Sequence, residues 1–345
     1  MKKLAFFDAK PYDKLWFDAL KEQYGFKIKY YESKLNEDTV SVAAGSDAIV
    51  AFVNDSVDQS VLKSLSENKV GIVALRSAGY NNVDFKAAYE EKVHVVRVPA
   101  YSPYAVAEHA MALLLTLNRH THRAYNRTRD YNFSLNGLTG FDLYGKTIGV
   151  IGTGKIGQVF IDICKGFGMK VLAFDPYPVQ GKGIEYVSLS ELCSRADIIS
   201  LHCPLTKDTN HMINRETLAL MKEGVYLINT SRGALIDSEA LLEAIKAKRV
   251  GGAGLDVYEE ESDLFFEDFS NTIMQDDVLA RLVSMPNVIV TSHQAFLTQE
   301  ALKNIAETTL QNLKAYFDGD ALSNEICYQC DKEPMCPKKH DGRCF

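Results

Sequence analysis

The chain has 345 residues, 46% of them hydrophobic and 24% charged, and its formal net charge is −7. This length suits two domains that each bury a core, and the composition is that of an ordinary globular protein. The negative charge argues against nucleic acid or an acidic membrane as the partner, so a small molecule is expected. The beginning of the chain is too poor in apolar residues for a signal peptide, and no stretch approaches the roughly 18 apolar residues of a membrane span. The sequence therefore predicts a cytoplasmic protein.

Short β-type runs alternate with amphipathic stretches over about the first hundred residues. The runs are KLAFFDA, FKIKYYES, DAIVAFV, VGIVALRSA and VHVVRVP. This alternation predicts βαβ units with a parallel sheet. A long helical pattern then opens at Ser102 and Pro103, and its apolar positions are nearly continuous from Val106 to Leu117. A helix that is apolar on so many sides is expected to be buried between domains or subunits.

Residues 131–144 are typical of a loop, and a second series of β-type runs follows them. These runs are KTIGVIG, KVLAFD, ADIISLHCP, VYLINTS, GGAGLDV and NVIVTSH. Strands of this kind, with helical patterns between most of them, predict a second doubly wound domain of the dinucleotide-binding type. The last helical pattern ends at Gly319 and could return to the first domain.

TIGVIGTGKIGQVF places Gly152, Gly154 and Gly157 in G-x-G-x-x-G register between an apolar strand and a helical pattern. Such glycines allow a tight turn, close approach to a pyrophosphate and close helix packing, while the helix N-terminus favours the phosphate charge. The next strand ends at Asp175, whose carboxylate can accept hydrogen bonds from ribose hydroxyls and would repel a phosphate there. The pattern predicts NAD rather than NADP. The alternatives are that the glycines serve packing only and that Asp175 only shapes the turn into Pro176.

Three side chains follow the ends of predicted strands, where ligands bind in open α/β sheets. Arg232 follows VYLINTS, Glu261 lies in DVYEEE, and His293 follows NVIVTS. A guanidinium suits a carboxylate, and a histidine suits proton transfer near neutral pH. A carboxylate at Glu261 would fix one ring nitrogen of His293 and leave the other for substrate. The set predicts hydride transfer between nicotinamide and C2 of a 2-oxo or 2-hydroxy acid.

A simpler interpretation stays open for each member of this set. A histidine at a strand end is often a hydrogen-bonded structural residue, and Arg232 could pair with Asp237. Spacing alone does not separate Glu261 from the two glutamates that precede it.

Long stretches of the chain resemble the D-isomer-specific 2-hydroxyacid dehydrogenases, and within them the fermentative NAD-dependent D-lactate dehydrogenases. The resemblance runs over nearly all of residues 1–326 and is carried by LRSAGYNNVD, VPAYSPYAVAEHAMALLLTLNR, GKTIGVIGTGKIG, NTSRGALID, GLDVYEEE followed by LFFED, and MPNVIVTSHQAFLT. It implies an α/β fold of two Rossmann-like domains, each a doubly wound parallel sheet, with the active site in the cleft between them. Residues 1–101 plus 296–326 would form the substrate-binding domain, and residues 102–295 the NAD-binding domain.

The resemblance also implies roles for individual residues in the reduction of pyruvate to D-lactate by NADH. His293 would be the general acid, Glu261 would tune it, and Arg232 would clamp the substrate. The implied cofactor-binding residues are Gly152, Gly154, Lys155, Ile156, Gly157, Asp175, Cys203, Pro204, Thr230, Ser231, Arg232 and Asp256, the last toward the carboxamide. The implied substrate contacts are the backbone of Ala78 and Gly79, the hydroxyl of Tyr101, Arg232 and His293, with Phe52 and Phe296 walling the side-chain pocket. A homodimer, or a higher homo-oligomer, is implied through the helix around Ala107 to Leu117.

Residues 327–345 form a Cys-rich tail without a counterpart in the usual family pattern. Cys327, Cys330, Cys336 and Cys344 follow a C-x2-C-x5-C-x7-C spacing, and His340 adds a nitrogen. Four thiolates could hold zinc or an iron–sulfur cluster, although the spacing fits no standard signature. Disulfides and simple docking on the body of the protein are the alternatives.

Competing functions also stay open at this stage. A dehydrogenase for a larger 2-oxo acid would carry the same catalytic groups, because one methylene in an apolar pocket is worth only about 1–3 kcal/mol. A protein of another class, a scaffold that senses NADH, could keep the fold without the reaction. The complete set of Arg232, Glu261 and His293 favours an enzyme.

Overall fold

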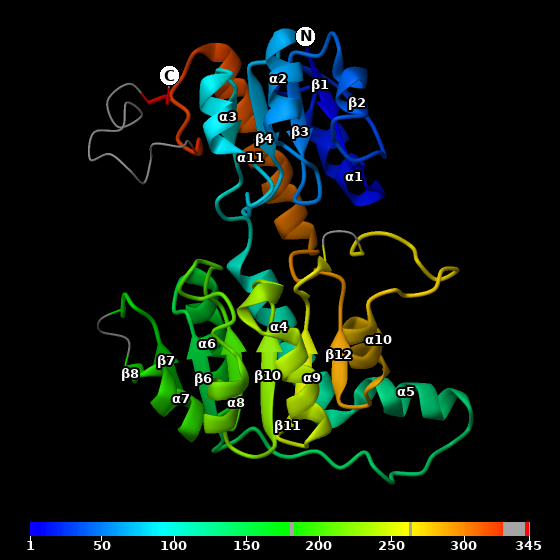
Figure 1. The fold of residues 1–345 in the computed structure, drawn as a ribbon, viewed down its shortest axis with the longest axis vertical. Coiled ribbons are helices and arrows are strands. Elements are labelled where there is room, and N and C mark those ends of the chain that lie inside the picture. Colours follow the sequence, from blue (N-terminus) through cyan, green and yellow to red (C-terminus); the bar gives the residue numbers. More distant parts are fainter. Residues whose placement is uncertain (180–182, 262–263, 327–341, 345) are drawn as a thin grey trace. The chain divides into compact units, whose positions relative to one another are not determined.

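The chain folds into two compact units, each built around one parallel sheet with helices beside it (Figure 1). The structure, a computed structural model, describes residues 1–179, 183–261, 264–326 and 342–344. Unit 1 comprises Met1–Ser102 and Thr298–Phe345, and unit 2 comprises Pro103–Leu297. The expected fold class, two Rossmann-like α/β domains, is confirmed. Among the described helices, none combines the length and the hydropathy needed to span a lipid bilayer.

Unit 1 contains a five-stranded sheet in the order β2-β1-β3-β4-β5, and all its strand pairs are parallel. Its strands are β1 Lys2–Phe6, β2 Phe26–Tyr30, β3 Ala48–Ala51, β4 Ile72–Leu75 and β5 His94–Val96. Its helices are α1 Pro11–Leu20, α2 Gln59–Glu67, α3 Phe85–Glu90 and α11 Gln299–Asp318, with a 3-10 turn η1 at Val40–Ala43. Each of the five predicted β-type runs forms one of these strands.

The alternation of side chains along β1 explains how unit 1 buries both faces of its sheet. Leu4 and Phe6 belong to a core cluster that includes Phe17 of α1 and Leu310 of α11. Ala5, next to them in sequence, belongs to the opposite cluster, with residues of α2 and α3. Successive residues of a strand point to opposite faces, so a run that is apolar throughout fits a sheet covered on both sides. The covering helix α11 comes from the far end of the chain.

Unit 2 contains a seven-stranded sheet in the order β12-β11-β10-β9-β6-β7-β8, and all its strand pairs are parallel. Its strands are β6 Thr147–Ile151, β7 Lys170–Phe174, β8 Glu185–Tyr186, β9 Ile198–Leu201, β10 Val225–Asn229, β11 Val250–Leu255 and β12 Val288–Val290. Its helices are α4 Pro103–Arg119, α5 Thr121–Arg129, α6 Lys155–Gly166, α7 Leu189–Arg195, α8 Arg215–Leu220, α9 Ser238–Lys246 and α10 Asp277–Ser284, with a 3-10 turn η2 at Gly233–Leu235. The strand order reverses between β6 and β9, and ligands bind at such a switch point.

The long apolar helix is explained by packing inside unit 2. Ala107, Ala110 and Leu114 of α4 are fully buried in a cluster that also contains Phe160 of α6 and Ile148 of β6. The apolar character of this helix is thus explained by its packing against α6 and the sheet of its own unit, and a contact of the helix with another subunit stays a prediction.

Candidate active site

The glycine-rich turn joins β6 to α6 at the switch point of the unit 2 sheet. Gly152 has φ +93°, and a Cβ there would collide with the backbone of His202. A Cβ on Gly157 would overlap the carbonyl oxygen of Gly152. These two positions therefore require glycine for the fold itself. Gly154 differs, because a Cβ there would meet no protein atom within 4 Å, so open space lies at the N-terminus of α6.

Asp175 joins this turn to the end of β7. Its Oδ2 accepts hydrogen bonds from the Thr153 backbone N–H at 2.6 Å and the Thr153 hydroxyl at 3.0 Å, and its Oδ1 accepts one from the Tyr177 N–H at 2.8 Å. Asp175 thus shapes the turn after Pro176, as the simpler interpretation held. Its side chain is nevertheless half-buried rather than covered, and a carboxylate has lone pairs left for ribose hydroxyls.

The residues around this turn fit a dinucleotide. The space in front of Gly154 lies where a pyrophosphate would meet the free N–H groups of α6, including those of Lys155 and Ile156. The hydroxyl of Thr230, after β10, is buried and has no hydrogen-bond partner among the described residues. Cys203, after β9 and just before the exposed Pro204, is not a nucleophile, because burial raises the pKa of its thiol to about 11.

His293 and Glu261 form a direct pair at the carboxyl end of the same sheet. His293 Nδ1 lies 2.7 Å from Glu261 Oε1, and both side chains keep 19% of their surface exposed. The backbone N–H of Tyr258 donates to the other carboxylate oxygen at 2.9 Å, which holds Glu261 in place. Because Nδ1 faces a carboxylate, it carries a proton, and Nε2 is left for another partner.

The two neighbouring glutamates are excluded from this role by their own contacts. Glu259 forms an ion pair with His211, and its other oxygen accepts a bond from the Ser238 N–H at 3.4 Å. Glu260 is exposed. The choice that spacing left open is thereby made by geometry, and it agrees with the choice that the resemblance implied.

Arg232 follows β10 and keeps its guanidinium available. Its Nη1 donates to the carbonyl oxygen of Ser231 at 2.7 Å, and its own carbonyl accepts a bond from Asn229 Nδ2 at 2.8 Å. The described residues include no carboxylate paired with Arg232. Asp237 instead caps α9 by accepting from the Ala240 N–H at 2.9 Å, which removes the alternative partner.

Asp256 follows β11, and its carboxylate is held by several groups of the protein, while its predicted contact with the cofactor stays a prediction. Asp256 is fully buried, and its carboxylate accepts from the Thr291 hydroxyl at 2.5 Å and from the backbone N–H groups of Gln294 and Ala295 at 2.9 and 2.8 Å. His109 of α4 lies 3.3 Å away. Burial raises the pKa of Asp256, but the hydrogen bonds of His109, Thr291 and Ala295 outweigh it and lower that pKa below its ordinary value. His109 and Thr291 lie in two of the stretches that carry the family resemblance, but sequence reasoning assigned neither of them a role of its own.

The predicted substrate residues of unit 1 lie after β4 and before α4. None of the described groups accepts a hydrogen bond from the N–H of Ala78 or Gly79, whereas their carbonyl oxygens accept from Arg97 at 2.8 Å and from the Ser77 hydroxyl at 2.8 Å. Two free neighbouring N–H groups on a fixed loop are suited to an anion. Tyr101 is half-buried, and its carbonyl accepts from Asn304 Nδ2 of α11 at 2.7 Å.

The two aromatic residues assigned to a pocket wall are both largely covered. Phe52 keeps 5% of its surface exposed, and the Arg76 guanidinium lies over its ring at 3.8 Å from the centroid. Phe296 keeps 8% exposed. Either side chain can therefore offer a ligand only a small part of its surface.

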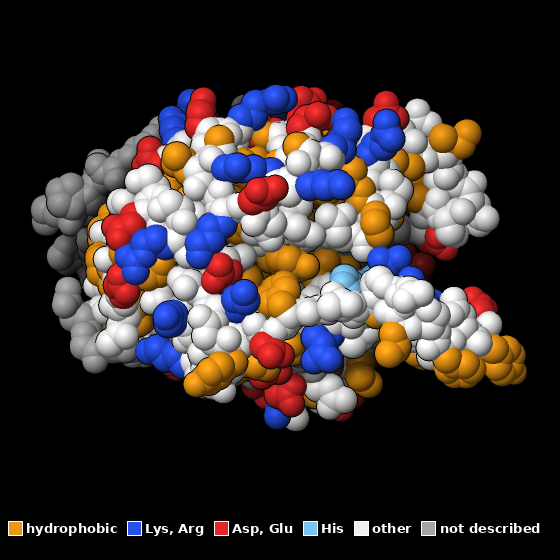
Figure 2. All heavy atoms as spheres, turned by 90° about the horizontal axis from the view of Figure 1, so that it is seen from below, with side chains coloured by type: hydrophobic (Ala, Val, Ile, Leu, Met, Phe, Trp, Pro, Cys, Tyr) orange, Lys and Arg blue, Asp and Glu red, His pale blue; other side chains and the backbone are white. Residues whose placement is uncertain are grey.

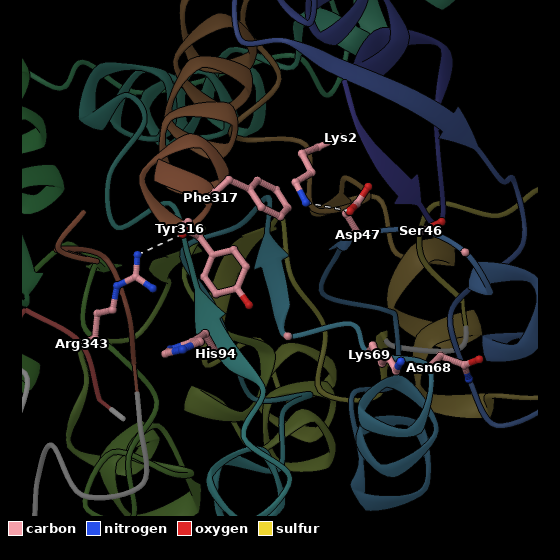
Figure 3. A pocket seen from close by; sticks show the side chains of 11 residues that line it. Lys2, Ser46, Asp47, Asn68, Lys69, His94, Tyr316, Phe317 and Arg343 are labelled. Carbon is pink, nitrogen blue, oxygen red and sulfur yellow. Dashed lines mark hydrogen bonds and ion pairs between the residues drawn. The ribbon is translucent and has the colours of Figure 1, made fainter. Parts of the chain in front are cut away.

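A pocket of about 550 Å³ lies at the amino end of the unit 1 sheet, the end opposite to Ala78 and Gly79 (Figure 3). Its charged side chains have partners within the molecule. Lys2 pairs with Asp47 at 3.0 Å, and His94 pairs with Glu325 at 2.5 Å. Arg343 donates to carbonyl oxygens at the end of α11, among them Tyr316 O at 3.0 Å. Lys2 and Asp47 offset each other, whereas Lys69 and Arg343 leave the lining of this pocket with an excess of positive charge.

The surface shown in Figure 2 carries acidic and basic side chains side by side, without a patch of one sign. Of the tail, only residues 342–344 belong to the described part of the chain. Cys344 is buried there, and its N–H donates to Glu325 at 2.8 Å. Cys327, Cys330, Cys336 and His340 lie outside the described residues, so the predicted metal or disulfide site stays a prediction.

Comparison with known proteins places the chain in a family. Residues 111–295 match the family model described as D-isomer specific 2-hydroxyacid dehydrogenase, NAD binding domain. A D-lactate dehydrogenase of Escherichia coli is 54% identical over 94% of this chain and 99% of its own. Among solved structures, one reported as the pyruvate reductase of Chlamydomonas reinhardtii has a TM-score of 0.89 at 46% identity, covering 94% of this chain and 98% of its own. A D-lactate dehydrogenase with NAD+ from Lactobacillus jensenii has a TM-score of 0.79 at 31% identity, covering 94% and 99%. The chain therefore belongs to the D-isomer specific 2-hydroxyacid dehydrogenases and is an NAD-dependent oxidoreductase.

Proposed function

We propose that this protein reduces pyruvate to D-lactate with NADH, and that His293, Glu261 and Arg232 carry the reaction. The single observation that supports the proposal most is the 2.7 Å pair of His293 and Glu261 at the sheet edge where Arg232 also lies, in a chain 54% identical to a D-lactate dehydrogenase. The cofactor supplies hydride to the C2 carbon when it is bound. A cytoplasmic location and a homodimer stay predictions.

The residues of the chain would handle the charge and the proton. Arg232 would hold the substrate carboxylate and polarise the ketone, because a guanidinium donates two parallel hydrogen bonds. His293 Nε2 would donate its proton to the ketone oxygen as the hydroxyl forms. Glu261 would stabilise the imidazolium before this transfer and hold the ring through Nδ1. The N–H groups of Ala78 and Gly79 would bind the carboxylate.

The proposal is tested with His293→Ala and Arg232→Ala in a steady-state assay with pyruvate and NADH. Removal of a general acid usually costs a factor of about 10²–10⁴ in rate, and a loss in this range is expected for His293→Ala. A comparable loss is expected for Arg232→Ala, shared between kcat and KM, because the guanidinium both polarises the ketone and holds the carboxylate. NADH binding to His293→Ala, followed by fluorescence titration, should stay within about threefold of wild type because the glycine-rich turn is intact. A near wild-type rate in either variant would contradict the assigned roles.

The choice of substrate needs its own experiment. Rates across a series of 2-oxo acids, with the chirality of each product determined, would show whether pyruvate or a larger acid is preferred. Turnover of any of them also excludes the second candidate function, an NADH-sensing scaffold. Binding of NADH without turnover of any acid in the series would favour that scaffold.

A further inference from the structure

The hydrogen bonds around Asp256 form a chain whose direction the geometry fixes. The Thr291 hydroxyl has one proton, and at 2.5 Å from Asp256 Oδ1 it gives that proton to the carboxylate. His109 Nε2 lies 3.1 Å from the same hydroxyl oxygen. The oxygen has no further proton to offer, so Nε2 must carry one and donate it. His109 therefore donates toward the Thr291 oxygen and toward Asp256 Oδ1, 3.3 Å away, and Thr291 in turn donates to Asp256.

Asp256 holds the segment that carries His293 on both sides of that residue. Before it, Thr291 donates its hydroxyl; after it, Gln294 and Ala295 donate their N–H groups. The N–H of His293 donates to the Asp256 carbonyl oxygen at 2.7 Å. His293 itself has φ +50°, a left-handed conformation that costs a non-glycine residue about 1–2 kcal/mol. Such a conformation persists only where the surroundings fix it, and here these bonds to Asp256 do so.

The same carboxylate also ties down the start of unit 2. His109 belongs to α4, which begins at Pro103, the first residue of the unit, while Ala295 lies two residues before Leu297, the last. Both segments through which the chain enters and leaves unit 2 are thus connected through Asp256. No motif assigns His109 to the dinucleotide or to substrate.

We propose that His109 is a positioning residue, which fixes the orientation of the His293 imidazole through Thr291 and Asp256. The inference rests on the proposed role of His293 as proton donor. Loss of the His109 N–H would leave the Thr291 oxygen without its donor and loosen the segment from residue 291 to 295. A displacement of about 1 Å in a catalytic group can cost a factor of about 10² in rate.

Two matched pairs of variants test this proposal. His109→Leu and Thr291→Val remove the hydrogen-bonding groups at nearly constant volume, while His109→Gln and Thr291→Ser retain a donor and a hydroxyl. We expect kcat to fall by about 10–100-fold in the first pair and to return to within about threefold of wild type in the second. NADH affinity and the KM for pyruvate should change by less than about threefold, because the displaced group acts on the reacting oxygen.

The outcomes separate this proposal from the proposed function. If His293→Ala is inactive but His109→Leu keeps the wild-type kcat, the positioning role is wrong and the proposed function stands. If His293→Ala itself stays active, the proposed function is wrong. A purely structural role for His109 would appear as a lower thermal midpoint with an unchanged kcat of the folded enzyme, and that result would also overturn the inference.

Discussion

His202 shows how a single partly buried residue, with its ring nitrogens covered, couples stability to pH. It follows β9, its Nε2 lies 2.9 Å from the Ser200 hydroxyl, and its Nδ1 has no partner among the described residues. Burial lowers the pKa of His202 to about 3. In the unfolded chain the same ring takes a proton at about pH 6.5. Between these values only the unfolded state binds the proton, so the free energy of unfolding falls as the pH drops from about 6.5 toward 3.

The prediction is that His202→Asn weakens this dependence on acid. A single group of this kind contributes a slope of about 1.4 kcal/mol per pH unit within its window. Urea unfolding at pH 7.5 and pH 5.5 should therefore show a loss for the wild type that is about 1 kcal/mol larger than for the variant. His120→Asn, at a left-handed position that asparagine tolerates, is the control. Equal losses in all three proteins would show that His202 does not titrate in this way.

For single residues, the sequence predicts the groups that react with substrate better than the residues that hold those groups in position. Arg232 and His293 were predicted because ligands gather at strand ends, and the structure places both at the carboxyl edge of the unit 2 sheet. Their roles stay predictions until variants are assayed. His109 gave no signal, because a histidine within an apolar helix is usually structural. Only the contact of α4 with residue 291, distant in the sequence, distinguishes it.

The glycine-rich turn allows a prediction at the scale of an element, because its glycines serve different purposes. Gly157→Ala should destabilise unit 2, since its Cβ would overlap the Gly152 carbonyl oxygen. Gly154→Ala should leave the thermal midpoint unchanged, since its Cβ would meet only open space. The same methyl group would obstruct a pyrophosphate, so NADH affinity should fall by about tenfold or more. Thermal denaturation and NADH titration check both, and a Gly154→Ala variant that binds NADH normally would place the cofactor elsewhere.

The bounds of helices and strands are harder to predict from the sequence than their presence. β8, Glu185–Tyr186, was not predicted, because two residues are too few to show a period. The helical pattern that begins at Pro103 does not show where the helix ends: α4 stops at Arg119, and His120 adopts φ +50° before α5 begins. Nothing local marks this break, since neither glycine nor proline is present there. The core strands were predicted because they are apolar on both faces, which follows from the covering helices.

The state of assembly is a property of the whole molecule, and the exposed apolar residues suggest where to test it. Beside the predicted contact through α4, the large exposed side chains of α5 and of the loop after it are candidates for a contact between copies. They are Tyr125, Tyr131, Phe133, Leu135 and Tyr144, between 61% and 85% exposed. We expect Phe133→Ser with Leu135→Ser to lower the average mass in sedimentation equilibrium. Tyr177→Ser, at an equally exposed site elsewhere, should leave the mass unchanged, and a dimer that survives the double substitution would rule this surface out.

The insertion of unit 2 within unit 1 has a consequence for synthesis on the ribosome. One face of the first sheet, which includes Leu4, Phe6 and Val50, is covered by α11, and α11 begins only at Gln299. At a translation rate of about 5–20 residues per second, the segment between Val96 and Gln299 delays the covering of this apolar face by about 10–40 seconds. Unit 2 is complete before α11 has been synthesised, so it can fold first. We therefore expect the nascent segment Met1–Ser102 to be the part of this enzyme most exposed to aggregation during synthesis.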